Sequence, residues 1–498
     1  MDNKELSALD KKHVWHPFTQ MKEWVDSDPL IISSGKGCYI KDINGRWYLD
    51  GVSSLWVNIF GHRRQEINEA IKGQLDRIAH STLLGLSGDT SIRLAERLCI
   101  LLNHRLKTTD GNGLNKVFYS DNGSTAVEVG LKMAFQYWIN SGISGRDRFI
   151  SLNQGYHGDT LGAVSVGGID IFHSTFGALL FPTYKSPSPF CYRCELGLDR
   201  TTCSMSCLDK MEELLKEHSK TIAGVIVEPM VQGVAGMRVA PAGFLLGVRE
   251  LCTKYNTIMI VDEVATGFGR TGRMFACEHE GVVPDIICLS KGITGGYMPL
   301  AVTIAGDNIY QAFMGETREL IPSCVQKYNK TARRKRHRRT VMYAAELMTQ
   351  PTQVDDRTQL GIKTFFHGHS YTGNPLACAA ALACLDIFER DDIINKLVTK
   401  IGILDRWLKK ISGLKHVGDA RHLGLMAGVE LVMDKETKKP YPYEQKMGYQ
   451  VTDNLREKGV ILRPIGNVII IMPPLTIKDE ELSIMLDLLE SAIIEVTE

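Results

Sequence analysis

The sequence predicts an α/β fold, with a large domain built on a mainly parallel sheet that helices cover, and a smaller α+β domain. In the middle of the chain, short and almost wholly apolar runs alternate with segments of helical periodicity. Such runs are typical of parallel strands buried on both faces, and their alternation with helices indicates a sheet wrapped on both sides. The last third shows a different pattern, and 498 residues leave room for two domains.

Strands of the large domain are expected where Val and Ile are concentrated. These runs are Lys116–Tyr119, Arg148–Leu152, Ala223–Val227, Thr257–Val261, Asp285–Leu289 and Ala301–Ala305. A helix is expected after the first run, because its apolar residues share one helical face. They are Ala126, Val129, Met133, Ala134 and Tyr137. Thr125–Glu128 has the form of a capping box at the start of this helix.

The last third is expected to form the smaller domain. Its helices are predicted at Leu397–Ile411 and Asp479–Thr497, and its strands at Gly424–Leu431, Gly459–Arg463 and Val468–Met472. We therefore divide the chain into an N-terminal segment that joins the small domain (1–65), the large domain (66–316), an insertion (317–362), and the end of the large domain with the small domain (363–498). The insertion carries the basic run Thr331–Thr340, which is expected to be a loop.

Composition argues against several classes of protein. Lys and Arg number 58 against 57 Asp and Glu, a net charge of +1 that calls for neither nucleic acid nor a membrane surface as partner. The N-terminus lacks the apolar stretch of a signal peptide, and no apolar run approaches the length of a membrane span. We expect a cytoplasmic protein in which the 12 cysteines remain thiols.

Four loops at the ends of predicted strands carry the candidate chemistry, because ligands of α/β sheets bind at the carboxyl ends of strands. Gly123 and Ser124 open a helix, where free N–H groups favour an anion such as phosphate. Tyr156, with Asp159 in the same loop, is placed to stack on a flat ring. Asp262 ends an apolar strand and needs a partner there. Lys291 ends another, where desolvation makes an amine nucleophilic.

Each loop alone has an ordinary structural explanation. The first is compatible with a simple N-cap, the second with a turn around a packed aromatic ring, and most lysines are surface charges. A backbone group or Arg270 would also satisfy Asp262. The combination is more specific, since a phosphate cradle, a stacking tyrosine, an aspartate and a lysine are the groups that pyridoxal phosphate requires.

These loops and several longer runs resemble the class III pyridoxal-phosphate aminotransferases of fold type I over nearly the whole chain. The similar runs are Trp15–Met21, Asp50–Trp56, Gly155–Thr160, Asp262–Gly272, Ser290–Gly292, Phe366–Pro375 and Leu462–Gly466. Within this family the sequence is similar to the branch that serves biotin biosynthesis by converting 8-amino-7-oxononanoate to 7,8-diaminononanoate. The resemblance therefore implies an enzyme with small-molecule substrates and pyridoxal 5′-phosphate as cofactor.

The resemblance also implies roles for individual residues. Lys291 would carry the cofactor, Asp262 would pair with its ring nitrogen, and Tyr156 would stack on the ring and meet substrate. Gly123 and Ser124 would hold the phosphate. His369 and Ser370 would reach that phosphate from the neighbouring subunit of a homodimer. The expected substrate residues are Leu55, Trp56, Tyr156, Asp159, Lys291, Gly368 and Arg463, with the Arg463 guanidinium gripping the substrate carboxylate.

The amino donor implied is S-adenosylmethionine or L-lysine. Family members that use S-adenosylmethionine tend to have Tyr at the positions of Phe18 and Ile470, and Trp at that of Leu55. The sequence is more similar to members that use lysine. Two other functions remain open: another class III ω-amino acid transaminase, and a non-enzymatic regulator that binds nucleic acid through Arg333–Arg339.

A cluster of Cys191, Cys194, Cys203 and Cys207 lies between two predicted elements of the large domain. Four thiolates can form a closed zinc site, but the spacing is not that of a standard finger or ribbon. We therefore expect no metal, and keep zinc as an alternative for this cluster.

Overall fold

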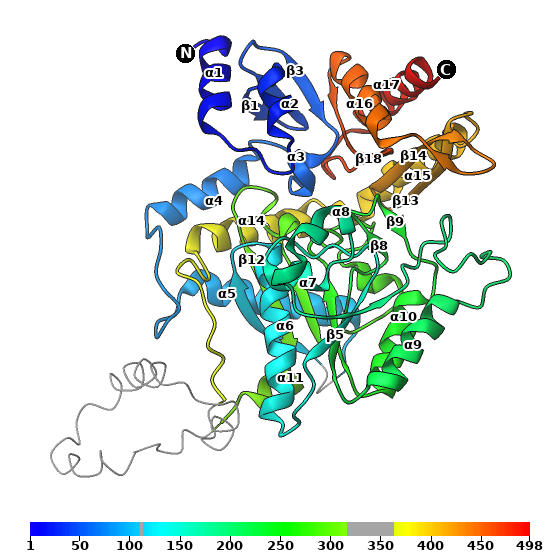
Figure 1. Ribbon diagram of the computed structural model, residues 1–498. Coiled ribbons are helices and arrows are strands. Elements are labelled where there is room, and N and C mark those ends of the chain that lie inside the picture. Colours follow the sequence, from blue (N-terminus) through cyan, green and yellow to red (C-terminus); the bar gives the residue numbers. More distant parts are fainter. Residues whose placement is uncertain (110–112, 316–362) are drawn as a thin grey trace, which may run out of the picture.

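The computed structural model describes residues 1–109, 113–315 and 363–498, and shows two domains, one above the other (Figure 1). The larger, lower domain contains a seven-stranded sheet, and the smaller one contains both ends of the chain. The predicted insertion at 317–362, with its basic run, lies outside the described residues. Within the described parts of the chain, no helix is long and apolar enough to cross a membrane.

The central sheet has the strand order β4-β12-β11-β10-β7-β5-β6. Its strands are β4 (Leu114–Ser120), β5 (Arg148–Leu152), β6 (Tyr184–Ser186), β7 (Ile222–Val227), β10 (Ile258–Asp262), β11 (Ile286–Leu289) and β12 (Ala301–Gly306). Neighbours from β11 to β6 run parallel, which confirms a mainly parallel sheet. Strand β12 is antiparallel to β11 and β4, because the segment between β11 and β12 is too short for a parallel crossover.

All six strands predicted for this sheet are present, and β6 was missed. Strand β6 lies at the edge and consists of Tyr, Lys and Ser, two of them only half-buried, so no apolar run marks it. The central strands are buried on both faces. Ile258 and Ile260 of β10 join one apolar cluster with α6 (Gly123–Asn140), while Met259 and Val261 join another with α5 (Asp89–Leu106) and α14 (Pro375–Arg390).

Helix α6 begins at Gly123, and the capping box predicted at Thr125–Glu128 is wrong. The N-cap is Asn122, whose extended backbone leaves its side chain free to accept from the backbone N–H of Thr125. Thr125 is the other member of this box, since its hydroxyl oxygen accepts from the N–H of Asn122. Glu128 instead accepts a hydrogen bond from the N–H of Gly162, 2.7 Å away, and so holds α7 (Leu161–Val166) against α6.

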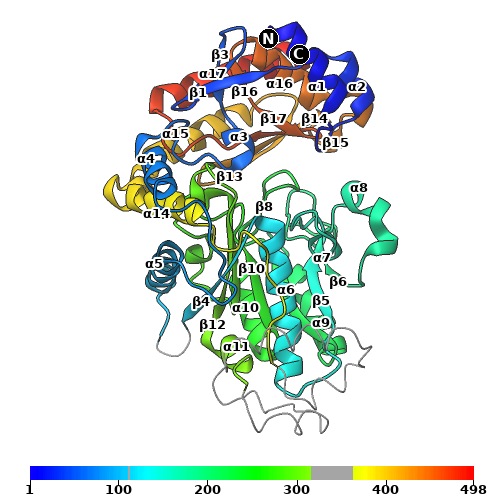
Figure 2. The same ribbon diagram turned by 90° about the vertical axis from the view of Figure 1, so that its left-hand side faces the viewer.

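Two sheets and several helices build the small domain (Figure 2). The first sheet has the order β1 (Ile32–Lys36), β2 (Tyr39–Asp42), β3 (Trp47–Asp50) and β16 (Val460–Ile461). The second has the order β13 (Val417–Leu423), β14 (Met426–Asp434), β18 (Val468–Ile471) and β17 (Arg463–Ile465), with β15 (Lys439–Pro440) beside β14. The helices are α1 (Asn3–His13), α2 (Met21–Asp26), α15 (Ile393–Ile411), α16 (Met447–Glu457) and α17 (Asp479–Thr497).

The strand predicted at Gly459–Arg463 is wrong as a single element. The chain changes sheets at buried Leu462, so that β16 pairs with β3 and β17 pairs with β18. The pairing of β16 with β3 ties the N-terminal segment to the C-terminal part of the chain. The two helices predicted here are present, and α17 has the predicted bounds.

Arg270 joins the two domains at a fully buried position. Its guanidinium donates to three carbonyl oxygens: that of Pro473 at 2.7 Å, and those of Trp56 and Asn58 at 3.1 Å. These carbonyls belong to segments far apart in the sequence, just after β18 and at the end of α3 (Ser53–Trp56). Arg270 therefore fixes α3 above the ends of the central strands.

Candidate active site

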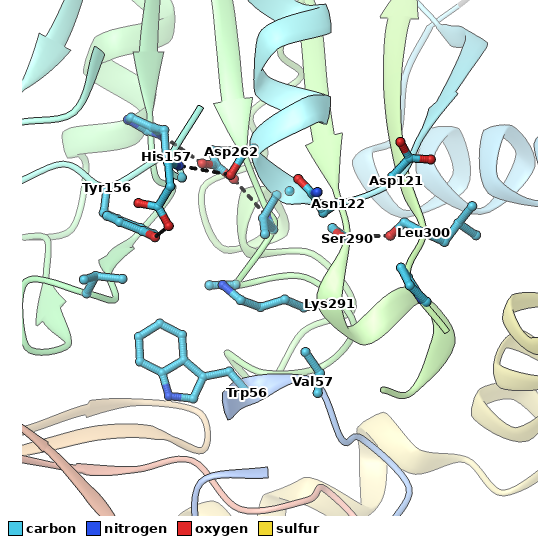
Figure 3. A pocket seen from close by; sticks show the side chains of 18 of the residues that line it. Trp56, Val57, Asp121, Asn122, Tyr156, His157, Asp262, Ser290, Lys291 and Leu300 are labelled. Atoms are coloured by element: carbon cyan, nitrogen blue, oxygen red, sulfur yellow. Dashed lines mark hydrogen bonds and ion pairs between the residues drawn. The ribbon is translucent and has the colours of Figure 1, made fainter. Parts of the chain in front are cut away.

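A cleft of about 680 Å³ lies between the carboxyl ends of the central strands and α3 (Figure 3). Most of the residues singled out from the sequence line it. They are Trp56, Gly123, Ser124, Tyr156, Asp159, Asp262 and Lys291. They come from segments that the fold brings together, as expected for side chains at the ends of neighbouring parallel strands.

Gly123 and Ser124 form the first turn of α6 at one wall of the cleft. Asn122 caps the N–H of Thr125, so the N–H groups of the two preceding residues remain available to a ligand. The ligand space here depends on glycine. A Cβ on Gly123 would lie 2.5 Å from Cγ1 of Val264, and a Cβ on Gly158 would lie 1.9 Å from Oγ of Ser124. The wall is therefore shaped as an anion cradle.

Asp262 lies buried at the end of β10, and its partner is His157 rather than Arg270. Nδ1 of His157 lies 2.7 Å from one carboxylate oxygen, and the N–H of Val264 donates to the other at 3.0 Å. A carboxylate only accepts, so Nδ1 carries the proton. The opposite ring nitrogen, Nε2, is buried and has no partner within the described residues.

His157 was not singled out from the sequence. The available signal was its place between Tyr156 and Gly158 in a loop at a strand end. Because the histidine leaves lone pairs of Asp262 free, the carboxylate can still accept a proton-bearing ring nitrogen in the cleft.

Glu228 adds a second buried carboxyl to the cleft floor. The N–H groups of Tyr156 and Gly233 each donate to one of its oxygens at 3.0 Å. Burial is the main cause that raises the pKa of Glu228 to about 7, and nearby Asp262 also raises it. This group is therefore poised between its two protonation states near neutral pH.

Lys291 follows β11 and points into the cleft above Trp56 (Figure 3). Its φ of +42° is in the left-handed region, and its Nζ lies 5.0 Å from the centre of the Trp56 ring. Desolvation lowers the pKa of the Lys291 amine, while Asp262 and Glu228 oppose this shift. A larger neutral fraction makes the amine a better nucleophile and proton acceptor.

Tyr156 and Asp159 form a pair on the side of the cleft that faces α8 (Asp170–His173). The Tyr156 hydroxyl donates to Asp159 at 2.7 Å, and the Asp159 N–H donates to Oγ of Ser124 at 3.1 Å. Burial and the Asp159 carboxylate raise the pKa of the Tyr156 phenol. The ring of Phe172 lies edge-on to Tyr156 at 6.4 Å, and Phe18 lies edge-on to Phe172 at 5.4 Å.

Five predicted site residues do not line the cleft of the single chain. Leu55 is 52% exposed beside Trp56, and Arg463 is exposed at the start of β17. Gly368 and Ser370 are exposed as well. Nδ1 of His369 lies 2.6 Å from the carboxylate of Asp121, and Asp121 lines the cleft. This histidine therefore contacts the rim of the cleft in its own chain.

The residues present fit pyridoxal phosphate. The start of α6 suits a phosphate, buried Asp262 suits a protonated ring nitrogen, and the desolvated Lys291 suits an aldehyde. The glycine positions keep the space open in which such a group would lie. Among the described residues that line the cleft, Lys291 is the only lysine or arginine.

The raised pKa of Glu228 predicts how stability depends on pH. The folded chain holds this proton more tightly than the unfolded chain, whose glutamates titrate near 4.5. Its stabilising contribution is present below about pH 4.5 and is lost as the pH rises through about 7. Relative to Glu228→Gln, the free energy of unfolding of the ligand-free chain should fall by roughly 3 kcal/mol between about pH 5 and 8.

Urea unfolding at a series of pH values measures this difference. The free energy of unfolding of Glu228→Gln should differ from that of the wild type by a constant amount, because the oxygen of the new amide can satisfy only one of the two N–H groups. The prediction therefore concerns how steeply the free energy of unfolding changes with pH. Glu96→Gln, at an exposed site on α5, should keep the wild-type slope. Parallel curves for wild type and Glu228→Gln would contradict the prediction.

Comparison with known proteins agrees with this geometry. The family described as aminotransferase class-III matches residues 20–319 and 340–493. The chain is 50% identical, over 497 residues, to the adenosylmethionine-8-amino-7-oxononanoate aminotransferase of Geobacter sulfurreducens, covering 100% of this chain and 99% of the relative.

Solved structures give the same result. The enzyme of that name from Methanocaldococcus jannaschii is 44% identical, with a TM-score of 0.85 and 100% of both chains covered. An amine transaminase from an uncultivated Pseudomonas species, with pyridoxal phosphate bound, is 36% identical, with a TM-score of 0.82 and 97% and 99% of the chains covered. The chain therefore belongs to the class III aminotransferases, which are pyridoxal-phosphate-dependent transaminases of fold type I.

Proposed function

We propose that the chain transfers an amino group to 8-amino-7-oxononanoate and forms 7,8-diaminononanoate in biotin biosynthesis. The observation that carries this proposal is the 50% identity, over the whole chain, to a relative that bears this activity in its name. The cleft supports it, since its lining combines the groups for transamination with the apolar face of Trp56 for an aliphatic substrate.

Pyridoxal phosphate, when bound, supplies an electron-withdrawing ring that stabilises negative charge on the substrate carbon. In our proposal Nζ of Lys291 would hold the cofactor until the donor amine displaces it. The freed Nζ would then take the proton from the donor carbon that bears the amine and give it to the cofactor, and the reverse transfer would serve the acceptor. Asp262, positioned by His157, keeps the ring nitrogen protonated throughout. Gly123 and Ser124 hold the phosphate at the start of α6, and Tyr156 stacks on the ring and orients the substrate.

The residues outside the cleft lining fit a homodimer in which two subunits share each site. Gly368, Ser370, Phe366 and Tyr371 are exposed in one extended segment, and the two aromatic side chains are 49% and 65% exposed. A second copy would bury these rings and bring Gly368 and Ser370 to the partner's cleft, and His369 would reach it by giving up its contact with Asp121 of its own chain. Arg463 would then bind the substrate carboxylate, with Leu55 and Asp159 nearer the reacting end.

The donor is proposed to be S-adenosylmethionine or L-lysine, and Phe18, Leu55 and Ile470 favour lysine. Phe18 reaches the cleft wall through its contact with Phe172, whereas Ile470 is buried. The relatives carry adenosylmethionine in their names.

Another ω-amino acid transaminase is the second candidate, because the fold is also shared with amine transaminases. The alternative of a non-enzymatic regulator that binds nucleic acid rests on Arg333–Arg339, which lie outside the described residues.

Replacing Gly158 by Ala should weaken cofactor binding. Gly158 has a φ of +120°, and the new Cβ would displace Ser124 from the phosphate wall. Binding must return Ser124 to its place against the new Cβ, and this overpacking costs about 1–3 kcal/mol, which predicts a loss of roughly five- to a hundredfold in affinity. Titration of the apoenzyme with pyridoxal phosphate measures it. Gly177→Ala, with nothing within 4 Å of its Cβ, is the matched control. Equal affinities for both variants would contradict this account.

Replacing Lys291 by Ala should abolish turnover and leave the fold intact. The loss should reach roughly 10²–10⁴-fold or more, since both the nucleophile and the proton carrier are removed. The assay follows formation of 7,8-diaminononanoate, with 4-aminobutyrate as the competing substrate, and circular dichroism checks the fold. Lys72→Ala, at an exposed site on α4 (Gln65–Leu75), should keep full activity. Full activity of Lys291→Ala would refute the mechanism, and preference for 4-aminobutyrate would refute the substrate.

The donor can be identified from a single half-reaction. The holoenzyme is mixed with L-lysine or with S-adenosylmethionine, without acceptor, and the visible absorption of the bound cofactor is followed. We expect lysine to change the spectrum, because a pocket with Phe18 and Leu55 lacks the polar and aromatic groups of the other branch. A change with S-adenosylmethionine alone would reverse this assignment.

A further inference from the structure

The segment between β6 and α9 (Ser206–His218) is unusually long for a connection without secondary structure. Residues 187–205 contain only turns and bends. Connections longer than about 12–15 residues without their own helix or strand are uncommon in compact domains, and they usually have a function. Three cysteines lie in this connection, and the fourth, Cys207, lies in the first turn of α9.

All four thiols face one hollow. Cys191, Cys194, Cys203 and Cys207 line a cavity of about 220 Å³, together with apolar and proline side chains and with Ser188, Glu195 and Arg200. Each is half-buried and free of disulfides. The sulfurs share this hollow but are not yet gathered around one point: in the described chain, no three potential ligands are already arranged as a metal site.

The first half of the connection is fixed firmly by groups other than the thiols. The buried ring of Phe190 lies between the guanidinium groups of Arg238 and Arg421, at 4.9 and 4.7 Å from its centre. Arg193 pairs with Glu430 of the small domain at 2.6 Å. The amide of Asn153, next to the Tyr156 loop, donates to Glu195 at 2.7 Å. Cys191 and Cys194 are therefore held on a rigid base.

The second half has mostly local hydrogen bonds, and Met205 at its end packs against the core. Asp199 accepts from the N–H groups of Thr201 and Cys203, which closes a turn on itself. One weak contact reaches back to the base, from Arg200 to the sulfur of Cys191 at 3.6 Å. Cys203 follows this turn and accepts at its sulfur from the N–H of Ser206, at the start of α9. Between Gly197, whose N–H donates to the carbonyl of Cys194, and Met205, the thiol of Cys203 is a group that could fasten the chain to the base.

We propose that Cys191, Cys194, Cys203 and Cys207 bind one Zn²⁺, which closes residues 187–205 over the hollow. The pairs C-x2-C and C-x3-C place two ligands on the rigid base and two at the start of a helix. Four thiolates form the closed tetrahedral shell of a structural zinc site. The bound zinc would stabilise the ion pair of Arg193 with Glu430 of the small domain and the hydrogen bond of Glu195 with Asn153, next to the Tyr156 loop. It would take no part in the reaction. It is independent of which substrates the cleft accepts.

The zinc content of the holoenzyme tests this proposal directly. We expect about one zinc per chain by elemental analysis of protein purified in metal-replete buffer, and less than about a tenth in Cys203→Ser/Cys207→Ser. Cys99→Ser, a half-buried thiol on α5 outside the cluster, is the matched control and should keep its zinc. Cobalt substitution of the wild type should add thiolate-to-metal absorption that the double variant lacks.

A measurement on the wild type covers the case in which the variant does not fold. Removal of zinc by a strong chelator should speed proteolysis within 187–205 at least about tenfold, and added zinc should restore protection. Absence of zinc and of the cobalt spectrum in the wild type would overturn the proposal. So would zinc retained in the double variant, or a disulfide between these cysteines in freshly isolated protein.

Discussion

The buried pair of Asp262 and His157 is the constraint on which the site depends. A carboxylate at the end of an apolar strand is costly unless hydrogen bonds surround it, and here the imidazole and the Val264 N–H supply them. The histidine belongs to the loop after β5, so satisfying the aspartate also fixes the Tyr156 loop against β10. The same pair therefore sets both the charge at the cleft floor and the position of the Tyr156 ring.

The two domains meet the cleft in different ways. The central sheet provides charge and hydrogen-bonding groups at its strand ends, while the small domain provides Trp56 as an apolar cover. Arg270 holds these parts together, because its two terminal guanidinium nitrogens donate to the carbonyls of Trp56, Asn58 and Pro473, while its buried Nε has no partner within the described residues. A charge buried at this junction therefore makes relative movement of the domains unfavourable. The left-handed backbone from Ser53 to Trp56 is held by the same contacts.

Much of this arrangement could be predicted from the sequence, and the failures have physical causes. Apolar runs revealed six of the seven strands of the central sheet, and helical periodicity revealed α6. Edge strand β6 and polar β13 carry no such run, so only their pairing identifies them. The break at Leu462 was hidden, because its apolar neighbours suit either sheet. Lys291, Asp262 and Tyr156 were found from their place after strands, whereas His157 needed the three-dimensional contact. The roles of all the predicted site residues stay predictions, and Arg463, Gly368 and Ser370 also do not line the cleft of the single chain.

The pairing of β3 with β16 has a consequence for synthesis of the protein in the cell. Strand β3 ends at residue 50, and its parallel neighbour begins at residue 460, so the ribosome must add all the residues between them before this edge is covered. Until then Leu49 and its apolar neighbours remain open to solvent and to other nascent chains. The sheet that contains β3 is therefore completed only after β16 has been made.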